Sequence, residues 1–313
     1  MLNRRHIRVK VMQSIYAMRQ SNSDNIEKQE KFLLVSIENC IELYLIMVSA
    51  LVEIRKKEEL FLEISKNKHL STPEDRNPNK RFVNNPVLLA LEENNSLNVS
   101  LEKHKITNWQ ANDDTILFLL QDIKKSELYN DYLAQSNTTF EQDRDFVADM
   151  FAEIIAPNEK LYSYLEDFKL TWVDDIPMVN TEILKQLKKF SKQHDNFRVP
   201  KLYKDLEDKD FVISIFRKTI LNEEKLAKEY IDKTPNWDVD RIAEIDTIIL
   251  KMAIAEFLYF PSIPIKVTIN EYLELAKEYS TPKSSIFING ILDNLVKGFQ
   301  ANDRIKKIGR GLM

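Results

Sequence analysis

Glycine is almost absent from this 313-residue chain, which contains four glycines, three of them within the last sixteen residues. Tight hairpin turns need a positive φ angle, and glycine adopts such an angle most easily. The chain is instead rich in Leu, Ile, Lys and Glu, and runs that alternate apolar with polar residues are short and rare. The sequence therefore predicts an all-α fold in a chain long enough to bury a core.

The clearest helical pattern lies near the carboxy-terminal end. Its apolar residues recur at spacings of three and four, which places them on one face of a helix from about residue 238 to 259. A Pro-Ser-Ile-Pro segment ends this helix, and a second helix with Ile269 and Leu273 inward is expected after it. The apolar face of the first helix consists of Ile245, Ile248, Ile249, Met252, Ala253 and Phe257.

A third helix is predicted after Pro282, with Ser284 as its N-cap. Gly290 lies inside this helix, where a glycine costs about 1 kcal/mol relative to alanine. We therefore expect another backbone to approach the helix closely at Gly290.

The amino-terminal half shows a different organisation. Residues 27–66 have the apolar spacing of one helix that could extend about 60 Å, unless it breaks near residues 55–59. Residues 67–86 carry three prolines among polar residues, which predicts an exposed loop. In this loop Lys80, Arg81 and Phe82 could contact nucleic acid, although a solvated loop is the simpler interpretation. Helices are predicted to resume from Asn112.

The sequence also repeats itself at an offset of 65 residues. Segments 145–175 and 210–240 align without a gap, and the alignment pairs Trp172 with Trp237. Such a repeat predicts two related helical hairpins that bury the same face, whereas chance similarity between two amphipathic helix pairs is the alternative. Other aligned pairs are Phe146 with Phe211, Phe151 with Phe216, Ile155 with Ile220 and Leu161 with Leu226.

The formal net charge of −4 hides an uneven distribution. Residues 1–20 carry +5 and residues 297–313 carry +4, which leaves −13 for the remainder. Two basic ends on an acidic body indicate a local site for a polyanion, although solvated, flexible termini would give the same pattern. The single cysteine, Cys40, has apolar neighbours and is expected to be buried.

Several function classes find no support in the sequence. No apolar stretch approaches the roughly 20 residues that cross a bilayer, so we expect a soluble, cytoplasmic protein without membrane contact. The four histidines are scattered, and the sequence contains neither a phosphate-binding glycine loop nor a nucleophile motif. We therefore predict no enzyme activity, no catalytic residue, no metal and no cofactor.

Two segments of the chain resemble the NusB family of bacterial transcription antitermination factors. Downstream, AEFL at 255–258 precedes an Ile-Pro loop, INEYLELAK at 269–277 and FINGILD at 287–293. Upstream, RRHIRVKVMQSIYAM at 4–18 is similar to the arginine-rich first helix of the family, and the matches together cover somewhat under a third of the chain. The resemblance implies a NusB-like helical bundle in the carboxy-terminal part, with additional helices inserted after the first helix.

Family members are usually much shorter than this chain, so its amino-terminal half departs from the family pattern. Either the first helix packs onto the carboxy-terminal bundle, or the extra helices replace part of the usual amino-terminal bundle. The expected parts are an arginine-rich first helix at 1–20, an additional helical region at 21–205 with its polar loop at 67–86, a NusB-like helical domain at 206–300 and a basic tail at 301–313.

NusB proteins bind the single-stranded boxA element of nascent RNA together with NusE, a ribosomal protein of the small subunit. Arginines at a helix start also suit phosphate binding on physical grounds, because guanidinium groups and free backbone N–H groups both bind anions. Phe287 could equally be a core residue. The RNA contacts that the resemblance implies are Arg4, Arg5 and Arg8 on one side of the RNA surface and Lys283, Ser285 and Phe287 on the other.

Two further residues, Tyr16 and Asp246, match family positions near the NusE interface. Tyr16 could instead pack between helices, and Asp246 could be an ordinary surface acid.

We interpret the sequence as that of a transcription antitermination factor. By the resemblance, it binds boxA-like RNA with a NusE-like ribosomal protein in the transcription elongation complex during rRNA synthesis. One alternative is a helical protein-interaction scaffold without RNA binding. A second alternative, an accessory RNA-binding module of an RNA-modifying enzyme, would need a methyl-donor fold with a glycine-rich loop, which four glycines hardly supply.

Overall fold

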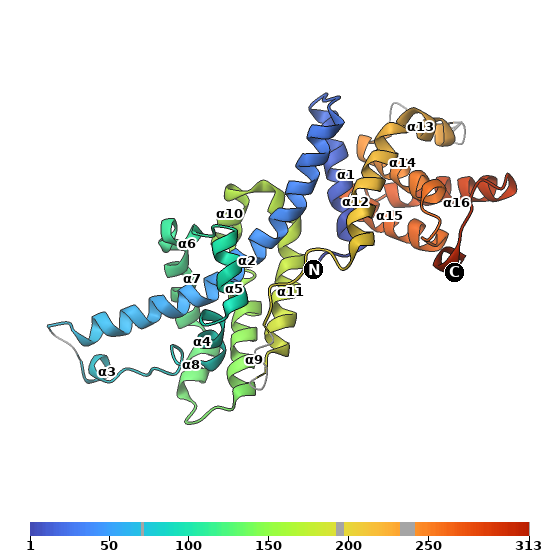
Figure 1. Cartoon of the computed structure of the whole chain (residues 1–313). Coiled ribbons are helices and arrows are strands. Elements are labelled where there is room, and N and C mark those ends of the chain that lie inside the picture. The colour runs from blue at the N-terminus through green and yellow to red at the C-terminus, as the bar shows by residue number, and fades with distance from the viewer. Residues whose placement is uncertain (70–71, 192–196, 232–241, 313) are drawn as a thin grey trace. The chain divides into compact units, whose positions relative to one another are not determined.

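The computed structural model describes residues 1–69, 72–191, 197–231 and 242–312 (Figure 1). Within these ranges the regular elements are all helices, and the prediction of an all-α fold is confirmed. The chain divides into two compact units. We call residues 2–37 with 203–313 the terminal unit, and residues 38–202 the middle unit. The helix α2, Ile26–Lys66, contributes its first turns to the terminal unit and the rest to the middle unit.

The terminal unit is a bundle around α14, Glu244–Tyr259. Every residue of α14 from Ile248 to Phe257 is buried, as expected for a helix with neighbours on all sides. It packs against α1, Arg4–Gln20, so the first helix lies on the carboxy-terminal helices. The other neighbours of α14 are α12, Leu206–Leu221; α13, Glu223–Ile231; α15, Ile265–Tyr279; and α16, Ser284–Ala301.

Three local predictions for these helices need comment. The predicted start of the α14 helix near residue 238 lies outside the described residues. Ser284 is not an N-cap: it is the first residue of α16, and its hydroxyl donates to Asp246 instead. Gly290 is exposed, and a Cβ built on it would meet no atom within 4 Å, so the predicted close approach of a backbone is wrong.

The middle unit surrounds the long helix α2. Cys40 and nearly all residues from Leu43 to Ile54 are buried, and two indoles fix neighbouring elements to its backbone. Trp109 Nε1 donates to the carbonyl of Ile46 at 3.1 Å, and Trp172 Nε1 donates to that of Asn39 at 2.9 Å. The remaining elements are α3, Pro73–Arg76; α4, Pro86–Glu92; α5, Asn95–Lys103; α6, Asn108–Ala111; α7, Asp113–Lys125; α8, Glu127–Ala134; α9, Phe140–Met150; the π-helix η1, Phe151–Ile155; α10, Glu159–Phe168; the 3₁₀ helix η2, Leu170–Asp175; and α11, Ile176–Lys189.

A short helix, α3, lies within the predicted loop, and longer helices resume at Pro86, earlier than the predicted Asn112. Asn85 and Asn94 explain the difference, because each caps a short helix with its buried side chain. In the preceding segment Phe82 is 1% exposed, and Arg81 donates to the carbonyl of Ser136 at 2.9 Å. These two residues anchor the segment, which leaves the nucleic-acid interpretation of the loop without its aromatic group.

The helix α2 does not break near residues 55–59. Arg55 stabilises this part, since it donates to the carbonyl of Val83 and pairs with Glu92.

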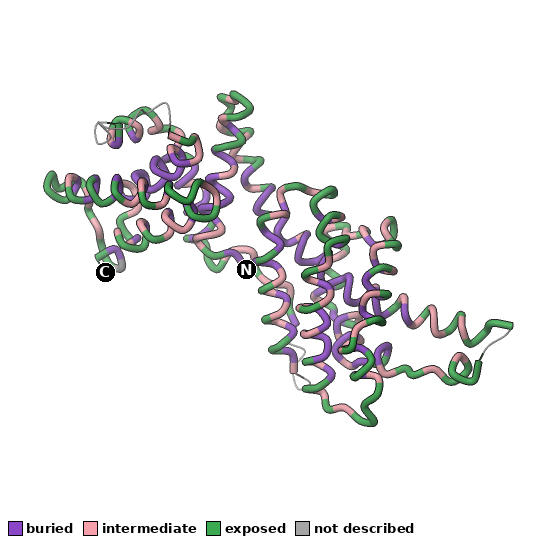
Figure 2. Tube along the Cα trace, turned by 180° about the vertical axis from the view of Figure 1, so that it is seen from behind, coloured by how far each residue is buried: buried purple, intermediate pink, exposed green. Residues whose placement is uncertain are grey.

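By length and composition α2 could cross a membrane, which corrects the expectation that no stretch is apolar enough. However, 67% of its apolar window is buried within the protein, as in the core helix of a soluble protein. Figure 2 colours the chain by burial: in each unit the buried residues, in purple, lie on the inner sides of the helices and the exposed residues, in green, on the outer sides.

The two repeat segments form matching helices where the structure describes them. At the offset of 65 residues, α9 with η1 corresponds to α12, and α10 corresponds to α13. Three of the aligned pairs are buried in both copies, namely Phe146 with Phe211, Phe151 with Phe216 and Leu161 with Leu226, whereas Ile155 is buried and its counterpart Ile220 is half-buried. Trp237 lies outside the described residues, so its equivalence to Trp172 stays a prediction.

Candidate nucleic-acid interface

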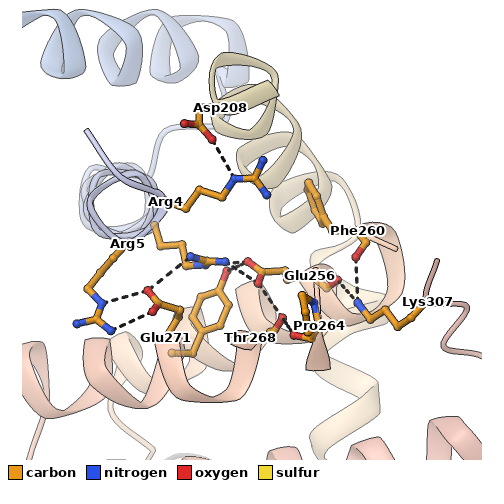
Figure 3. A network of polar contacts seen from close by, with 11 residues as sticks. Arg4, Arg5, Asp208, Glu256, Phe260, Pro264, Thr268, Glu271 and Lys307 are labelled. Atoms are coloured by element: carbon orange, nitrogen blue, oxygen red, sulfur yellow. Dashed lines mark hydrogen bonds and ion pairs between the residues drawn. The ribbon is translucent and has the colours of Figure 1, made fainter. Parts of the chain in front are cut away.

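The first turn of α1 holds the three predicted RNA-binding arginines. The side chain of Asn3 caps this turn by accepting from the backbone N–H of His6 at 3.0 Å. The three arginines nevertheless lie in different surroundings, and Figure 3 shows Arg4 beside Asp208 and Arg5 beside Glu271. Side-chain exposure is 34% for Arg4, 41% for Arg5 and 2% for Arg8.

Arg8 belongs to the core of the terminal unit. Its Nε and Nη2 atoms each donate to a carboxylate oxygen of Glu256 at 2.8 Å, and Glu256 is fully buried. The same carboxylate accepts from Thr268 at 2.8 Å and from Tyr272 at 3.2 Å. Burial lowers the pKa of Arg8, but the Glu256 carboxylate raises this pKa by more, so the guanidinium stays charged. Arg8 therefore ties α1 to α14 and is not accessible to a phosphate.

Arg4 and Arg5 lie at the surface but have acidic partners. Arg4 Nε donates to Asp208 at 2.9 Å, and Arg5 donates through Nε and Nη2 to both oxygens of Glu271 at 3.0 and 2.9 Å. A guanidinium has five N–H donors, so each arginine keeps donors beyond these bonds. The Glu271 carboxylate raises the pKa of Arg5 above its ordinary value.

A cavity of about 520 Å³ opens beside these arginines. Arg4, Arg5 and Arg8 line it, opposite the loop between α14 and α15. Its charges are mixed, because Glu207 and Glu271 line it as well. A bound phosphate would therefore have to compete with carboxylates that the arginines already contact.

Three of the other predicted residues meet between α14 and α16. A smaller cavity of about 240 Å³ is lined by Asp246, Lys283 and Phe287. Asp246 is 5% exposed; its Oδ2 accepts from Ser284 at 2.7 Å, and its Oδ1 has no partner among the described residues. The structure thus brings together Asp246, assigned to the protein partner, with two residues assigned to RNA. Ser285, half-buried, lies in the first turn of α16 but does not line this cavity.

Tyr16 lies on α1 with 39% of its surface exposed and lines neither of these two cavities. Its ring therefore offers an accessible surface two turns beyond Arg8.

The basic ends of the chain are less available than their charge indicates. Lys10 is 3% exposed, and Arg19 pairs with Glu223. At the other end Arg304 forms a bidentate pair with Glu229, and Lys307 Nζ donates to the carbonyl of Phe260 at 2.9 Å. Burial lowers the pKa of Lys307 to about 8. Arg304 and Lys307 are therefore held on the bundle, whereas Lys297 and Lys306 are exposed to solvent.

The sequence did not reveal the acidic partners of the arginines. Glu256 lies among the apolar residues of α14. A carboxylate buried there needs hydrogen-bond donors. This position in the sequence could therefore have indicated that Glu256 has a buried partner. Among the described residues, no group of three His, Cys, Asp or Glu side chains could hold a metal ion.

Comparison with known proteins identifies one family. The model of the NusB family matches residues 179–297, starting within α11. A transcription antitermination protein NusB from Salinibacter ruber is 42% identical over 121 residues, which are 38% of this chain and 74% of that protein. The NusB proteins of Chloroherpeton thalassium and Clostridium kluyveri are 41% and 43% identical over 35% and 32% of the chain, and the matches span 52% and 62% of their lengths. No solved structure matches the chain.

Proposed function

This chain belongs to the NusB family, and we propose that it acts as a cytoplasmic transcription antitermination factor. Its partners would be boxA-like single-stranded RNA and a NusE-like ribosomal protein within the transcription elongation complex. Because the family match covers about a third of the chain, this function is assigned to the terminal unit and leaves the middle unit unassigned. We propose no catalytic role for any residue.

One observation carries the RNA part of the proposal. Arg4 and Arg5 are neighbours at the start of α1, are partly exposed, and line a cavity of about 520 Å³. The first backbone N–H groups of the helix and its dipole also favour an anion there. Arg8, which is buried, would act by holding α1 in place.

The second part of the RNA surface would be formed by Lys283, Ser285 and Phe287 at the start of α16. Phe287 is half-buried and lines a cavity, so one ring face could stack on an unpaired base. Asp246 and Tyr16 stay proposed partner contacts. Asp246 is 5% exposed and its unbonded Oδ1 atom is buried, so a contact through this carboxylate would require the atom to become accessible to the partner.

A titration of boxA-like RNA with two variants tests the arginine site. Arg5→Ala should weaken binding because it removes a phosphate contact. Glu271→Gln should strengthen binding, since it removes a carboxylate that competes with phosphate for Arg5. Arg217→Ala is the matched control, because Arg217 is also an exposed arginine in a bidentate pair, with Glu30, but does not line either cavity.

The same titration with and without a NusE-like protein tests the assembly. We expect tight RNA binding only when the protein partner is present, because two modest surfaces then act together. If RNA binds in neither arm, the scaffold alternative takes precedence. If Arg5→Ala and Arg217→Ala weaken binding equally, the RNA surface lies elsewhere.

A further inference from the structure

Two exposed apolar residues of the middle unit, Phe168 and Leu170, lie two positions apart where α10 ends and η2 begins. Phe168 is 53% exposed and Leu170 is 73% exposed. Two carboxylates, Glu166 and Asp167, are exposed beside them. We call these four residues the α10 corner. We propose that the α10 corner binds a basic, amphipathic segment of a partner protein, which inserts an apolar side chain next to Phe168.

The aromatic ring at the corner is held rigidly. Phe168 stacks on Trp172 with ring centres 5.5 Å apart, and its other neighbour is Tyr164 at 5.9 Å. Trp172 is fixed by its hydrogen bond to Asn39, and the Tyr164 hydroxyl accepts from Asn108 at 2.8 Å. A preorganised aromatic side chain loses little entropy on binding, which is the property of interface hot spots.

The charge around the corner selects a basic partner. Among the residues that the structure describes, Glu166 and Asp167 have no ion-pair partner. The nearest cation in sequence, Lys169, already pairs with Glu42 at 2.5 Å and lies over the Trp172 ring. The whole middle unit contains 28 acidic and 21 basic residues, a net charge of −7, whereas the terminal unit contains 21 and 24, a net charge of +3.

This electrostatic pattern argues against RNA as the occupant. Phosphates would meet carboxylates at the α10 corner, and the middle unit as a whole repels polyanions. A segment with lysines or arginines flanking one apolar anchor would instead gain charge complementarity and burial of Phe168 and Leu170. The proposal does not depend on the proposed RNA function of the terminal unit.

Fluorescence anisotropy with the full chain and two defined peptides tests the proposal. One labelled peptide carries Leu at helical spacing and Lys elsewhere, and the other has Glu in place of every Lys. We expect the basic peptide to bind and the acidic peptide not to bind. Leu170→Ser should weaken this binding about tenfold by removing an anchor contact. Glu166→Gln with Asp167→Asn should reduce its salt dependence.

Val99→Ser is the matched control, since Val99 is a 54% exposed apolar residue elsewhere in the middle unit. It should leave peptide binding unchanged. Equal effects of Val99→Ser and Leu170→Ser, or equal binding of both peptides, would overturn the proposal. Light scattering adds a further criterion: if Leu170→Ser converts a dimer to a monomer, the occupant is a second copy of this chain. If the Leu170→Ser variant does not fold, the salt dependence of peptide binding by the Glu166→Gln, Asp167→Asn variant tests the proposal instead.

Discussion

At the residue scale, the three arginines of α1 divide into one structural and two surface residues. Arg8→Ala would leave the Glu256 carboxylate buried without its cation, which costs about 3–5 kcal/mol. Arg5→Ala breaks a pair at the surface and should cost at most about 1 kcal/mol. Urea unfolding of both variants checks this difference. Similar stabilities would mean that the Arg8 pair does not hold the bundle together.

This difference changes how the RNA site can be tested. Removing Arg4, Arg5 and Arg8 together would destabilise the bundle and lower RNA binding for that reason alone. The sequence could place three arginines at a helix start, but it could not show that the partner of Arg8 is Glu256, 248 positions away. Pairings between distant residues depend on tertiary packing, which local spacing does not encode.

Gly290 offers a second prediction at the residue scale. Because it is exposed in α16 with no atom within 4 Å of a built Cβ, Gly290→Ala should stabilise the protein by about 0.5–1 kcal/mol. Gly311→Ala is the contrasting control, since its Cβ would lie 2.0 Å from the carbonyl oxygen of Pro261. Urea midpoints should therefore move in opposite directions. A Gly290→Ala variant less stable than the parent would contradict the open surroundings of this residue.

At the element scale, the carboxy-terminal segment contacts the end of α14 through Lys307, whose Nζ donates to the carbonyl of Phe260. The pKa of Lys307 is about 8 in the folded chain, below the ordinary value of 10.5. Between these values the unfolded chain binds more protons, so this group makes stability rise as pH increases from 8. Between pH 8 and pH 9.5 the urea midpoint of the parent should therefore rise relative to that of the Lys307→Met variant. A constant difference would show that Lys307 titrates normally.

The repeated hairpins give a second prediction at this scale. Trp172 is fully buried, and the 65-residue offset pairs Trp237 with it in the sequence. Trp237→Ala should therefore cost about 3–5 kcal/mol, as Trp172→Ala should. Unfolding in urea measures both values. If Trp237→Ala lowers the free energy of unfolding by less than about 0.5 kcal/mol, as is typical of a surface position, the structural repeat includes the helices but not the tryptophan.

Helices were the part of the fold that the sequence predicted best. The apolar spacing of α2 and α14 is long and regular, so their type was clear from the chain alone. The short helices α4 and α5 were missed because buried Asn85 and Asn94 caps, and not apolar spacing, define their starts. For α2, Glu42 and Glu53 interrupt the apolar run, which concealed how apolar the helix is as a whole.

At the scale of the whole molecule, charge separates the two units. The terminal unit carries +3 and the middle unit −7, so RNA contacts are expected on the terminal unit alone. Screening limits the reach of the acidic residues to about 8–10 Å at physiological salt, so the middle unit should weaken RNA binding mainly at low salt. The two units would then serve different partners, an RNA and a basic protein segment.

The salt dependence of RNA affinity tests this division. For a single strand the slope of log affinity against log salt is negative, and its magnitude decreases by about 0.7 for each phosphate contact that is lost. Arg5→Ala, in the terminal unit, should decrease this magnitude by about that amount. Lys185→Ala with Lys188→Ala, two exposed lysines on α11 in the middle unit, should leave it unchanged. A reduced slope for the α11 variant would extend the RNA surface onto the middle unit and contradict the separation by charge.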